Sequence, residues 1–405
     1  MRLLDKIRSE VPALNQTVYG KNLVYFDNAA TAHKPQSVVD LVNMMNSKTN
    51  SNVHRAVYKL SADATELYET AREKVREFIN APAKEQIIFT SGTTMSINLL
   101  ANSFSQKFLK KGDVILVSQS EHHSNIVPWQ LACERVGASI SVIPLDENGR
   151  IDIDAFASLL SEKVKMVAVA QISNVLGVEN PVKEIVEMAH KFGAQVLIDG
   201  AQGIVHSKVD VVDLDCDYYA FSGHKLYAET GTGILYGKRE LLELLPPWMG
   251  GGDMVGTVSF VGTTYADLPL KFEAGTPNFI AASTLAPAID FAMLMRDAEI
   301  EKNQEEMTKA MFKGLNSVDG LKIYGTGEAK IPLFSFSVEG VHHSDIAQIM
   351  DKMGVAVRSG LMCAEPLISS FGETGLVRAS LAPYNTMEEV EYFFYSLNKV
   401  LKMLR

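Results

Sequence analysis

The sequence contains few cysteines, and they stand far apart. Only three of its 405 residues are cysteines, at positions 133, 216 and 363. Widely spaced thiols form neither a zinc cluster nor a disulfide framework, so we expect no cysteine-ligated metal and no disulfide-rich fold. A lone cysteine is most often a small buried apolar residue, and Cys133, Cys216 and Cys363 are first interpreted in that way.

Long apolar stretches and an excess of basic charge are also missing. No run approaches the roughly 18 apolar residues that span a bilayer. Residues 1–16 carry charges throughout and lack the apolar core of a secretion signal. The formal net charge is −10, whereas phosphate backbones are bound by clustered Lys and Arg. We therefore expect no membrane partner, no nucleic-acid partner and a cytoplasmic location.

The sequence also lacks internal repeats, a Walker phosphate loop and a G-x-G-x-x-G motif after a first strand. These absences count against a repeat protein, a P-loop protein and a dinucleotide-binding protein. From Glu85 onward, predicted strands alternate with predicted helices. The predicted strands are 85–91, 113–119, 139–145, 165–173 and 195–201, and the predicted helices are 94–112, 125–137 and 182–193. Apolar strands separated by helices indicate an α/β fold with a mostly parallel sheet covered on both faces. Its ligand site is expected beyond the carboxyl ends of the strands.

A chain of this length is expected to form two domains. The alternation weakens after Pro246, where a loop-rich stretch (246–278) is followed by a helical one (283–316). Segments 332–338, 344–354, 355–359, 375–382 and 387–404 then read as a small α/β unit. We predict a large domain over residues 25–290, and a small domain formed by residues 1–24 and 291–405.

A candidate phosphate site lies in "IIFTSGTTMSIN", which runs from a predicted strand through Ser91, Gly92, Thr93 and Thr94 into a helix. Free backbone N–H groups at a helix start, two hydroxyls and a glycine suit a phosphate group. The alternative is that Thr93 or Thr94 caps the helix, and this stretch alone favours the cap.

Asp199 ends the apolar strand "QVLID". A carboxylate there is costly to desolvate unless it meets a cation, such as the protonated ring nitrogen of a pyridine cofactor. An aspartate that caps the following turn explains this residue equally well.

Lys225 follows Ser222, Gly223 and His224 in a tight bend between two apolar segments. Buried lysines shift their pKa readily and form Schiff bases, and Ser222 and His224 can donate hydrogen bonds to a phosphate. Taken alone, Lys225 is better explained as a lysine that reaches the surface from a hairpin.

The order of these parts along one sheet overturns that interpretation. His122 and His123 follow another predicted strand, and one imidazole could lie over a ring and exchange protons; surface histidines are the alternative. Four features lie at the carboxyl ends of predicted strands, where they can converge. They are the candidate phosphate site, one of the two histidines, Asp199 and Lys225. The set predicts pyridoxal 5′-phosphate, whose hallmarks are a lysine imine and an acidic partner for the ring nitrogen.

The chain resembles the class-V, fold-type I pyridoxal-phosphate enzymes, and within them the Suf-type (group II) cysteine desulfurase and selenocysteine lyase branch. The matching stretches span nearly the whole chain in the family's order: "YFDNAATA", "NVHRAVYKLS", "SGTTMSIN", "EHHSNIVPWQ", "SNVLGVENPV", "IDGAQG", "DCDYYAFSGHK", "FEAGTPN", "VAVRSG", "CAEPL" and "VRASLAPYNT". The resemblance implies a large domain with a mostly parallel seven-stranded sheet, and a smaller C-terminal α/β domain.

Roles for individual residues follow from the resemblance. Lys225 would bond the cofactor and move the Cα proton, and His122 would stack on the ring. Asp199 would hold the ring nitrogen and Gln202 the ring oxygen. Phosphate binding would fall to Thr93, Thr94, Ser222 and His224, with Thr276 arriving from the other subunit of a homodimer. Asn174 and Arg378 would fix the substrate carboxylate, a task that suits the two-pronged arginine fork, and Arg358 would also belong to the substrate site.

The resemblance makes Cys363 a nucleophile, which reverses its first interpretation; Cys133 and Cys216 keep theirs. Cys363 lies in "VRSGLMCAEPL", a glycine-containing loop after a predicted strand, with Arg358 five positions earlier. A nearby cation favours the reactive thiolate. The pattern departs at Leu361 and Met362, where many family members carry two histidines.

The implied activity is that of a cysteine desulfurase. L-cysteine would become L-alanine, and its sulfur would form a persulfide on Cys363. A sulfur-acceptor protein of the Suf system would then take the sulfur for iron–sulfur cluster assembly. The alternatives are a selenocysteine lyase acting on L-selenocysteine, a class-V aminotransferase-like enzyme that does not use Cys363, and a non-catalytic cofactor-binding or assembly protein.

Overall fold

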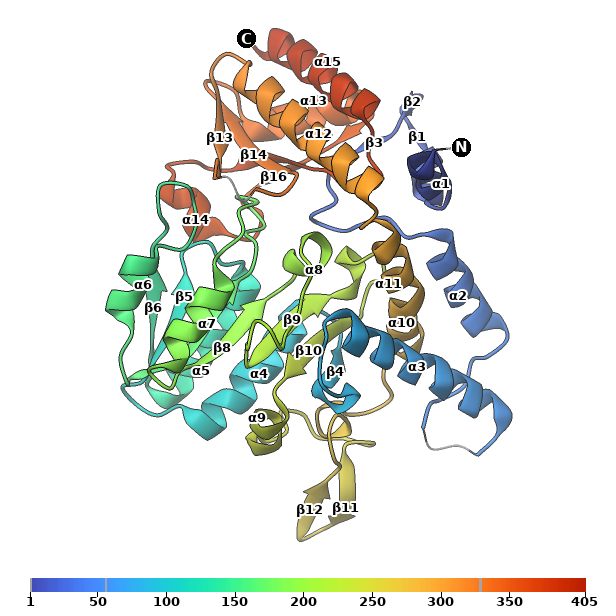
Figure 1. The fold of residues 1–405 in the computed structure, drawn as a ribbon, viewed down its shortest axis with the longest axis vertical. Helices are drawn as coiled ribbons and strands as arrows, with labels where there is room; N and C mark the ends of the chain where they lie inside the picture. The colour runs from blue at the N-terminus through green and yellow to red at the C-terminus, as the bar shows by residue number, and fades with distance from the viewer. Residues whose placement is uncertain (1, 55–56, 328–329) are drawn as a thin grey trace.

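The computed structural model describes residues 2–54, 57–327 and 330–405, so Arg55 and Ala56 of the stretch "NVHRAVYKLS" lie outside the described residues. Its centre is a seven-stranded sheet of order β4-β10-β9-β8-β7-β5-β6 (Figure 1). The strands are β4 (Ile87–Thr90), β5 (Val114–Ser118), β6 (Ser139–Ile143), β7 (Val164–Ala170), β8 (Gln195–Asp199), β9 (Tyr218–Ser222) and β10 (Gly233–Gly237). Within this sheet β10 alone runs antiparallel to its neighbours. The predicted mostly parallel sheet is confirmed.

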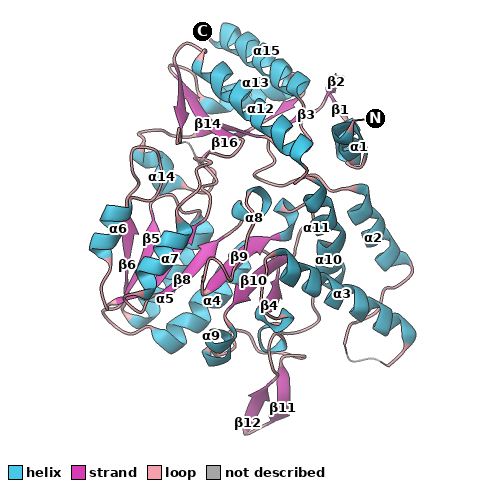
Figure 2. Cartoon of the chain, viewed as in Figure 1, coloured by secondary structure: helices cyan, strands magenta, loops and turns pink. Residues whose placement is uncertain are grey.

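Apolar side chains point to both faces of this sheet because successive residues of a strand alternate in direction. Leu197 of β8 lies in the core on one face, with α4 (Thr93–Phe108) and α5 (Val127–Val136). Its neighbours Val196 and Ile198 lie in the core on the other face. Helices lie around the sheet in Figure 2. The helices that contribute to that second core are α1 (Leu3–Ser9), α2 (Gln36–Ser47), α3 (Lys59–Phe78), α6 (Ile153–Leu159), α7 (Val182–His190), α8 (Gly203–His206), α10 (Phe279–Ser283), α11 (Leu285–Leu294) and α12 (Ala298–Asn316). Two covered faces explain why the strands read as continuous apolar runs.

The C-terminal part builds a second, antiparallel sheet of order β13-β14-β17-β16. Its strands are β13 (Leu321–Tyr324), β14 (Leu333–Val338), β16 (Arg358–Gly360) and β17 (Leu376–Ser380). Helices α12 (Ala298–Asn316), α13 (His343–Lys352) and α15 (Met387–Leu404) pack on it. The first turn of α15 is fixed by Thr386, whose hydroxyl accepts from the Glu389 backbone N–H while the Glu389 carboxylate accepts from that of Thr386.

The N-terminal residues contact this C-terminal sheet unit. They form α1 (Leu3–Ser9), β1 (Thr17–Val18), β2 (Lys21–Asn22) and β3 (Val24–Tyr25). Strand β3 pairs in parallel with β15 (Val355–Ala356). Arg8 Nη2 lies 2.8 Å from a Glu389 carboxylate oxygen, and Lys352 Nζ donates to the Tyr19 hydroxyl over 2.7 Å. Leu4, Ile7, Val11 and Leu14, however, lie in the apolar core of the large sheet. The N-terminal residues therefore contact both units, and the division into two domains stays a prediction.

The stretch predicted to be loop-rich, residues 246–278, contains a two-stranded hairpin and a 3-10 turn (Leu270–Phe272) between its loops. After α9 (Arg239–Leu244), an antiparallel hairpin of β11 (Val255–Ser259) and β12 (Gly262–Tyr265) projects from the body (Figure 1). Three helices, α10, α11 and α12, follow the hairpin. Asp297 starts α12 by accepting from the Glu299 backbone N–H over 2.9 Å, which separates α12 from α11. No single described helix is long and apolar enough to cross a membrane. Residues Phe279–Leu294 and α12, bent by 76°, meet that test only as a pair and only by length and composition.

Candidate active site

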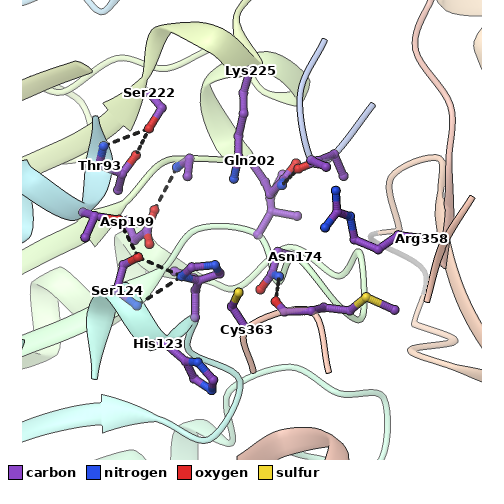
Figure 3. A pocket seen from close by; sticks show the side chains of 18 of the residues that line it. Thr93, His123, Ser124, Asn174, Asp199, Gln202, Ser222, Lys225, Arg358 and Cys363 are labelled. Carbon is purple, nitrogen blue, oxygen red and sulfur yellow. Dashed lines mark hydrogen bonds between the residues drawn. The ribbon is translucent and has the colours of Figure 1, made fainter. Parts of the chain in front are cut away.

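A cavity of about 540 Å³ opens where β7, β8 and β9 end and the small sheet comes close (Figure 3). Every predicted site residue except Thr276 lines it: Thr93, Thr94, His122, Asn174, Asp199, Gln202, Ser222, His224, Lys225, Arg358, Cys363 and Arg378. In Figure 3, Lys225 and Cys363 point into this space from opposite sides. The structure therefore brings the set together, while the chemical role of each residue stays a prediction.

Lys225 closes a short 3-10 turn (Gly223–Lys225) that continues from β9. The turn is held from outside, because the His224 carbonyl accepts hydrogen bonds from Ala32 N, Thr31 Oγ1 and Lys34 Nζ. Burial lowers the pKa of Lys225 to about 8, against the opposing effect of Asp199. Within the described chain the amine makes no hydrogen bond. The backbone thus fixes the position of Lys225. Its amine is partly neutral near pH 8 and is available to bond a ligand.

Asp199 is the last residue of β8 and is 5% exposed. Burial raises the pKa of its carboxyl, while the Ala201 backbone N–H, donating over 2.9 Å, and the charge of Lys225 favour the ionised form. The residue after Asp199 has to be glycine, because a Cβ on Gly200 would lie 2.0 Å from the Tyr219 ring. The Gln202 side chain donates to the Ala29 carbonyl over 2.8 Å, which orients it along the cavity wall.

A cluster of hydroxyls surrounds the start of α4. Ser222 Oγ accepts from Thr93 N over 2.8 Å and shares a 2.7 Å hydrogen bond with Thr93 Oγ1. Strand β10 approaches so closely that a Cβ on Gly233 would lie 2.3 Å from Gly92 Cα. The alternative that Thr93 or Thr94 caps this helix is wrong, because the N-cap of α4 is Gly92 and no side chain caps it. The hydroxyls instead meet at a helix start, where an anion is favoured.

His122 is oriented by Ser124, a residue that sequence reasoning missed. The Ser124 backbone N–H donates to His122 Nδ1 over 3.1 Å, and its hydroxyl lies 2.9 Å from Nδ1 and 2.8 Å from Thr94 Oγ1. Burial lowers the pKa of His122 to about 4, with Lys225 adding to the effect. An Nδ1 that accepts leaves the proton of the neutral ring on Nε2. The spacing H-x-S, from His122 to Ser124, would have been the signal rather than the histidine pair.

Beneath His122 lies Glu121, also missed, with 0% exposure. One carboxylate oxygen accepts from the Ser118 hydroxyl and from Ala170 N at 3.0 Å, and the other accepts from Asn125 Nδ2 at 2.7 Å. These bonds join the ends of β5 and β7 to the turn that carries His122. Burial raises the pKa of Glu121 to about 7.

Cys363 stands on an exposed loop between β16 and α14 (Glu365–Ser370). The loop is tied to the large sheet: His123 N donates to the Cys363 carbonyl over 2.7 Å, and Asn174 Nδ2 to the Met362 carbonyl over 2.9 Å. Met362 and Cys363 have φ values of 50° and 54°, a left-handed backbone that costs a non-glycine residue about 1–2 kcal/mol. Met362 is 7% exposed in a small apolar core. Leu361 and Met362 thus anchor the loop by apolar packing. The two histidines that many family members carry at these positions could instead transfer protons.

Arg378, on β17, is 2% exposed. Its Nη1 donates to the Asn174 carbonyl over 2.8 Å and its Nη2 to Asp27 Oδ1 over 3.3 Å. Its Nε is buried and has no hydrogen-bond partner among the described residues. A buried arginine donor without a partner is costly, so a ligand acceptor is expected at this position.

Thr276 lies elsewhere. It is exposed and does not line the cavity. Its neighbours Gly275 and Pro277 line a second hollow of about 190 Å³. Because Thr276 is predicted to serve the site of a partner subunit, its position in one chain leaves that prediction open. Cys133 and Cys216 are buried in the two apolar cores, and burial raises the pKa of both thiols, as expected of inert cysteines.

The donor set fits pyridoxal 5′-phosphate. The phosphate would meet the hydroxyls of Thr93, Thr94 and Ser222 at the start of α4, and the ring nitrogen would meet the buried Asp199 carboxylate. Lys225 offers an uncommitted amine, and the orphaned Arg378 Nε awaits an acceptor. A parallel α/β sheet that gathers these groups at its strand ends defines a pyridoxal-phosphate enzyme.

Comparison with known proteins gives the family. Residues 24–393 match the model of the class-V aminotransferase family, and the chain belongs to that family. It is 47% identical over 401 residues to a probable cysteine desulfurase of Vibrio cholerae, covering 99% of both chains. It is 43% identical over 403 residues to a cysteine desulfurase of Pectobacterium carotovorum, covering 99% of this chain and 98% of that one.

Solved structures agree. The cysteine desulfurase CsdA of Escherichia coli superposes with a TM-score of 0.92 at 39% identity, covering 99% of both chains. The apo cysteine desulfurase of Thermococcus onnurineus gives a TM-score of 0.94 at 35% identity, covering 100% of this chain and 99% of that one. The predicted family, fold type and cofactor are confirmed, while the assignment to the Suf-type branch stays a prediction.

Proposed function

We propose that this chain is a pyridoxal-phosphate-dependent cysteine desulfurase that stores the sulfur of L-cysteine as a persulfide on Cys363. The single observation that carries the proposal is the Cys363 side chain facing Lys225 across one cavity (Figure 3). An aminotransferase needs the lysine but has no use for a thiol at that place. The relatives named cysteine desulfurase support the same conclusion.

The residues of the cavity divide the work. Arg378 holds the substrate α-carboxylate through its unpaired Nε, with Asn174 beside it. Bound pyridoxal phosphate supplies an electron sink that acidifies the substrate Cα–H bond. Lys225, with its pKa lowered to about 8 by burial, takes and returns the proton at that carbon. Neutral His122 keeps its Nε2–H directed into the cavity because Ser124 occupies Nδ1.

Cys363 then performs the transfer. Its thiolate attacks the substrate sulfur, so that an S–S bond forms while the substrate C–S bond breaks. The electron pair stays with the carbon, which takes up a proton, and alanine leaves. Arg358, on the strand that leads into the loop, and Lys225 place positive charge near the thiol. Since Cys363 is exposed, a sulfur-acceptor protein of the Suf system can reach the persulfide for iron–sulfur cluster assembly in the cytoplasm.

A homodimer is the proposed working form. Phe260 and Val261, at the tip of the β11–β12 hairpin, are fully exposed apolar side chains, and such groups favour a protein partner. Thr276 would serve the neighbouring cavity. Light scattering coupled to size-exclusion chromatography tests the state: a mass of one chain at micromolar concentration would contradict it.

The proposal is tested by incubating the holoenzyme with L-cysteine and analysing its peptides by mass spectrometry. We expect one extra sulfur on the peptide that contains Cys363, and alanine in solution. Cys363→Ala should lose both, whereas Cys133→Ala, which removes a buried thiol, should keep both. Undiminished alanine release by Cys363→Ala would overturn the proposal, and activity confined to L-selenocysteine would favour the lyase.

A further inference from the structure

Two arginines face one another next to the cavity. Arg358 of β16 and Arg378 of β17 are directly opposed in the antiparallel register of these strands. Like charges at opposed positions weaken strand pairing. Strand β16 is also short, with three residues, and lies at the edge of its sheet. The pairing that places the following Cys363 loop is therefore expected to need a counter-charge.

Asp27 provides that counter-charge. It follows β3 and forms an isolated bridge with Ser380, at the end of β17. Its carboxylate holds Arg358 in two-pronged fashion, with Nε–Oδ1 at 3.1 Å and Nη2–Oδ2 at 2.9 Å, and accepts from Arg378 Nη2 at 3.3 Å. The hydrogen bond to Asp27 is the main cause of the raised pKa of Arg358. One carboxylate thus links both cations.

The charges of this cluster do not cancel in the free enzyme. Two guanidinium groups share one carboxylate, so one positive charge is left unbalanced, and both arginines line the cavity. A substrate α-carboxylate at Arg378 brings the second negative charge. It balances the cluster and reduces the repulsion between β16 and β17.

We propose that Asp27 is a positioning residue that couples occupancy of the carboxylate seat on Arg378 to the placement of the Cys363 loop. The inference rests on the proposed function, since it assigns the substrate carboxylate to Arg378. Asp27 supplies one of the two negative charges that balance Arg358 and Arg378, and the substrate carboxylate supplies the other. The loop begins at Leu361, directly after β16, so tighter pairing of β16 fixes the thiol when a substrate is there to attack.

Hydrogen–deuterium exchange of the holoenzyme tests this coupling. The probes are L-alanine, which carries the α-carboxylate without sulfur, and L-alaninamide, which lacks that charge. In Asp27→Asn, we expect peptide 358–364 to exchange faster on the order of tenfold, as lost charge-assisted hydrogen bonds predict. L-alanine should slow this exchange in both proteins, by a larger factor in Asp27→Asn, where it supplies the only negative charge. L-alaninamide should protect neither.

Three controls separate the coupling from general stability. Asp351→Asn removes an exposed carboxylate of α13 in the same unit and should leave peptide 358–364 unchanged. Peptides of β14 and α15 report on unfolding of the whole unit. Arg358→Gln removes one of the opposed charges, so L-alanine should protect the loop less than in the wild type; this variant keeps the test valid if Asp27→Asn folds poorly.

Unaltered exchange of peptide 358–364 in Asp27→Asn would overturn the inference. Equal acceleration in β14 and α15, or equal protection by L-alanine in the wild type and in Asp27→Asn, would overturn it as well. Failure of the proposed function has a different readout, because it would appear as absence of alanine release from L-cysteine by the wild type.

Discussion

The two sides of the cavity are built in opposite ways. On one side, Lys225, Asp199 and His122 stand at the ends of buried parallel strands, and burial shifts the pKa of each. On the other side, Cys363 stands on an exposed loop with a left-handed backbone, after an edge strand of three residues. The buried side adjusts proton affinity through desolvation, whereas the exposed side keeps a thiol accessible.

This difference matches two different demands. Proton transfer at carbon requires a group whose pKa lies near the working pH, and burial achieves this for Lys225 by lowering its pKa to about 8. Burial instead keeps His122 neutral, because it lowers the pKa of that imidazole to about 4. Passing sulfur to another protein requires a nucleophile that leaves the cavity or is reached from outside. One rigid surface could not meet both demands, so the site combines a fixed wall with a tethered loop. The tethers of this loop include His123 N to the Cys363 carbonyl, Asn174 Nδ2 to the Met362 carbonyl, and Glu365 N to His123 Nε2.

Removing the central group of the buried side should have the largest effect. We expect Lys225→Ala to lose the covalent link to the cofactor and to release alanine from L-cysteine more slowly by a factor on the order of 10³ or more, since it loses both the amine and the proton carrier. Borohydride reduction followed by peptide mapping should label Lys225 in the wild type alone. A reducible link in Lys225→Ala, or native turnover, would contradict the assignment of the buried side.

The buried side was also the more predictable one from sequence. Asp199, Ser222 and Lys225 end or follow continuous apolar strands, and parallel strands bring such positions together. The tethers were not predictable, because Asn174 and Met362 are 188 positions apart and neither belongs to a periodic pattern. Asp27 and Glu121 were missed for a related reason. These carboxylates are recognised by partners that lie far away in the sequence, which are Ala170 for Glu121 and both Arg358 and Arg378 for Asp27.

Glu121 allows the rigidity of the buried side to be tested through pH. Glu121→Gln places an amide NH2 group opposite the donor Asn125 Nδ2, so their hydrogen bond is lost. This loss should lower the free energy of unfolding by about 1–3 kcal/mol. Because burial raises the folded-state pKa of Glu121 from 4.5 to about 7, the folded state holds this proton more tightly than the unfolded chain. That contribution to stability is complete below pH 4.5 and is lost as pH rises towards 7.

Thermal unfolding at several pH values measures this dependence. The stability of the wild type relative to Glu121→Gln should decrease between pH 4.5 and about 7 and level off above that range. A gap between the two proteins that is constant from pH 4.5 to 8, or that widens with pH, would show that the carboxyl is ionised throughout. His122 would then rest on a charged support rather than on a neutral one.

The smallest effect is expected where the two sides meet. Asn174→Ala removes the 2.9 Å hydrogen bond to the Met362 carbonyl, worth about 1 kcal/mol, while Met362 remains packed in its apolar core. Alkylation of Cys363 by iodoacetamide should accelerate about fivefold. Cofactor absorbance and its pH dependence should stay as in the wild type, because the loop moves and the buried wall does not. A shifted cofactor spectrum without faster alkylation would mean that Asn174 belongs to the wall instead, and that the exposed side is held by packing and by His123 alone.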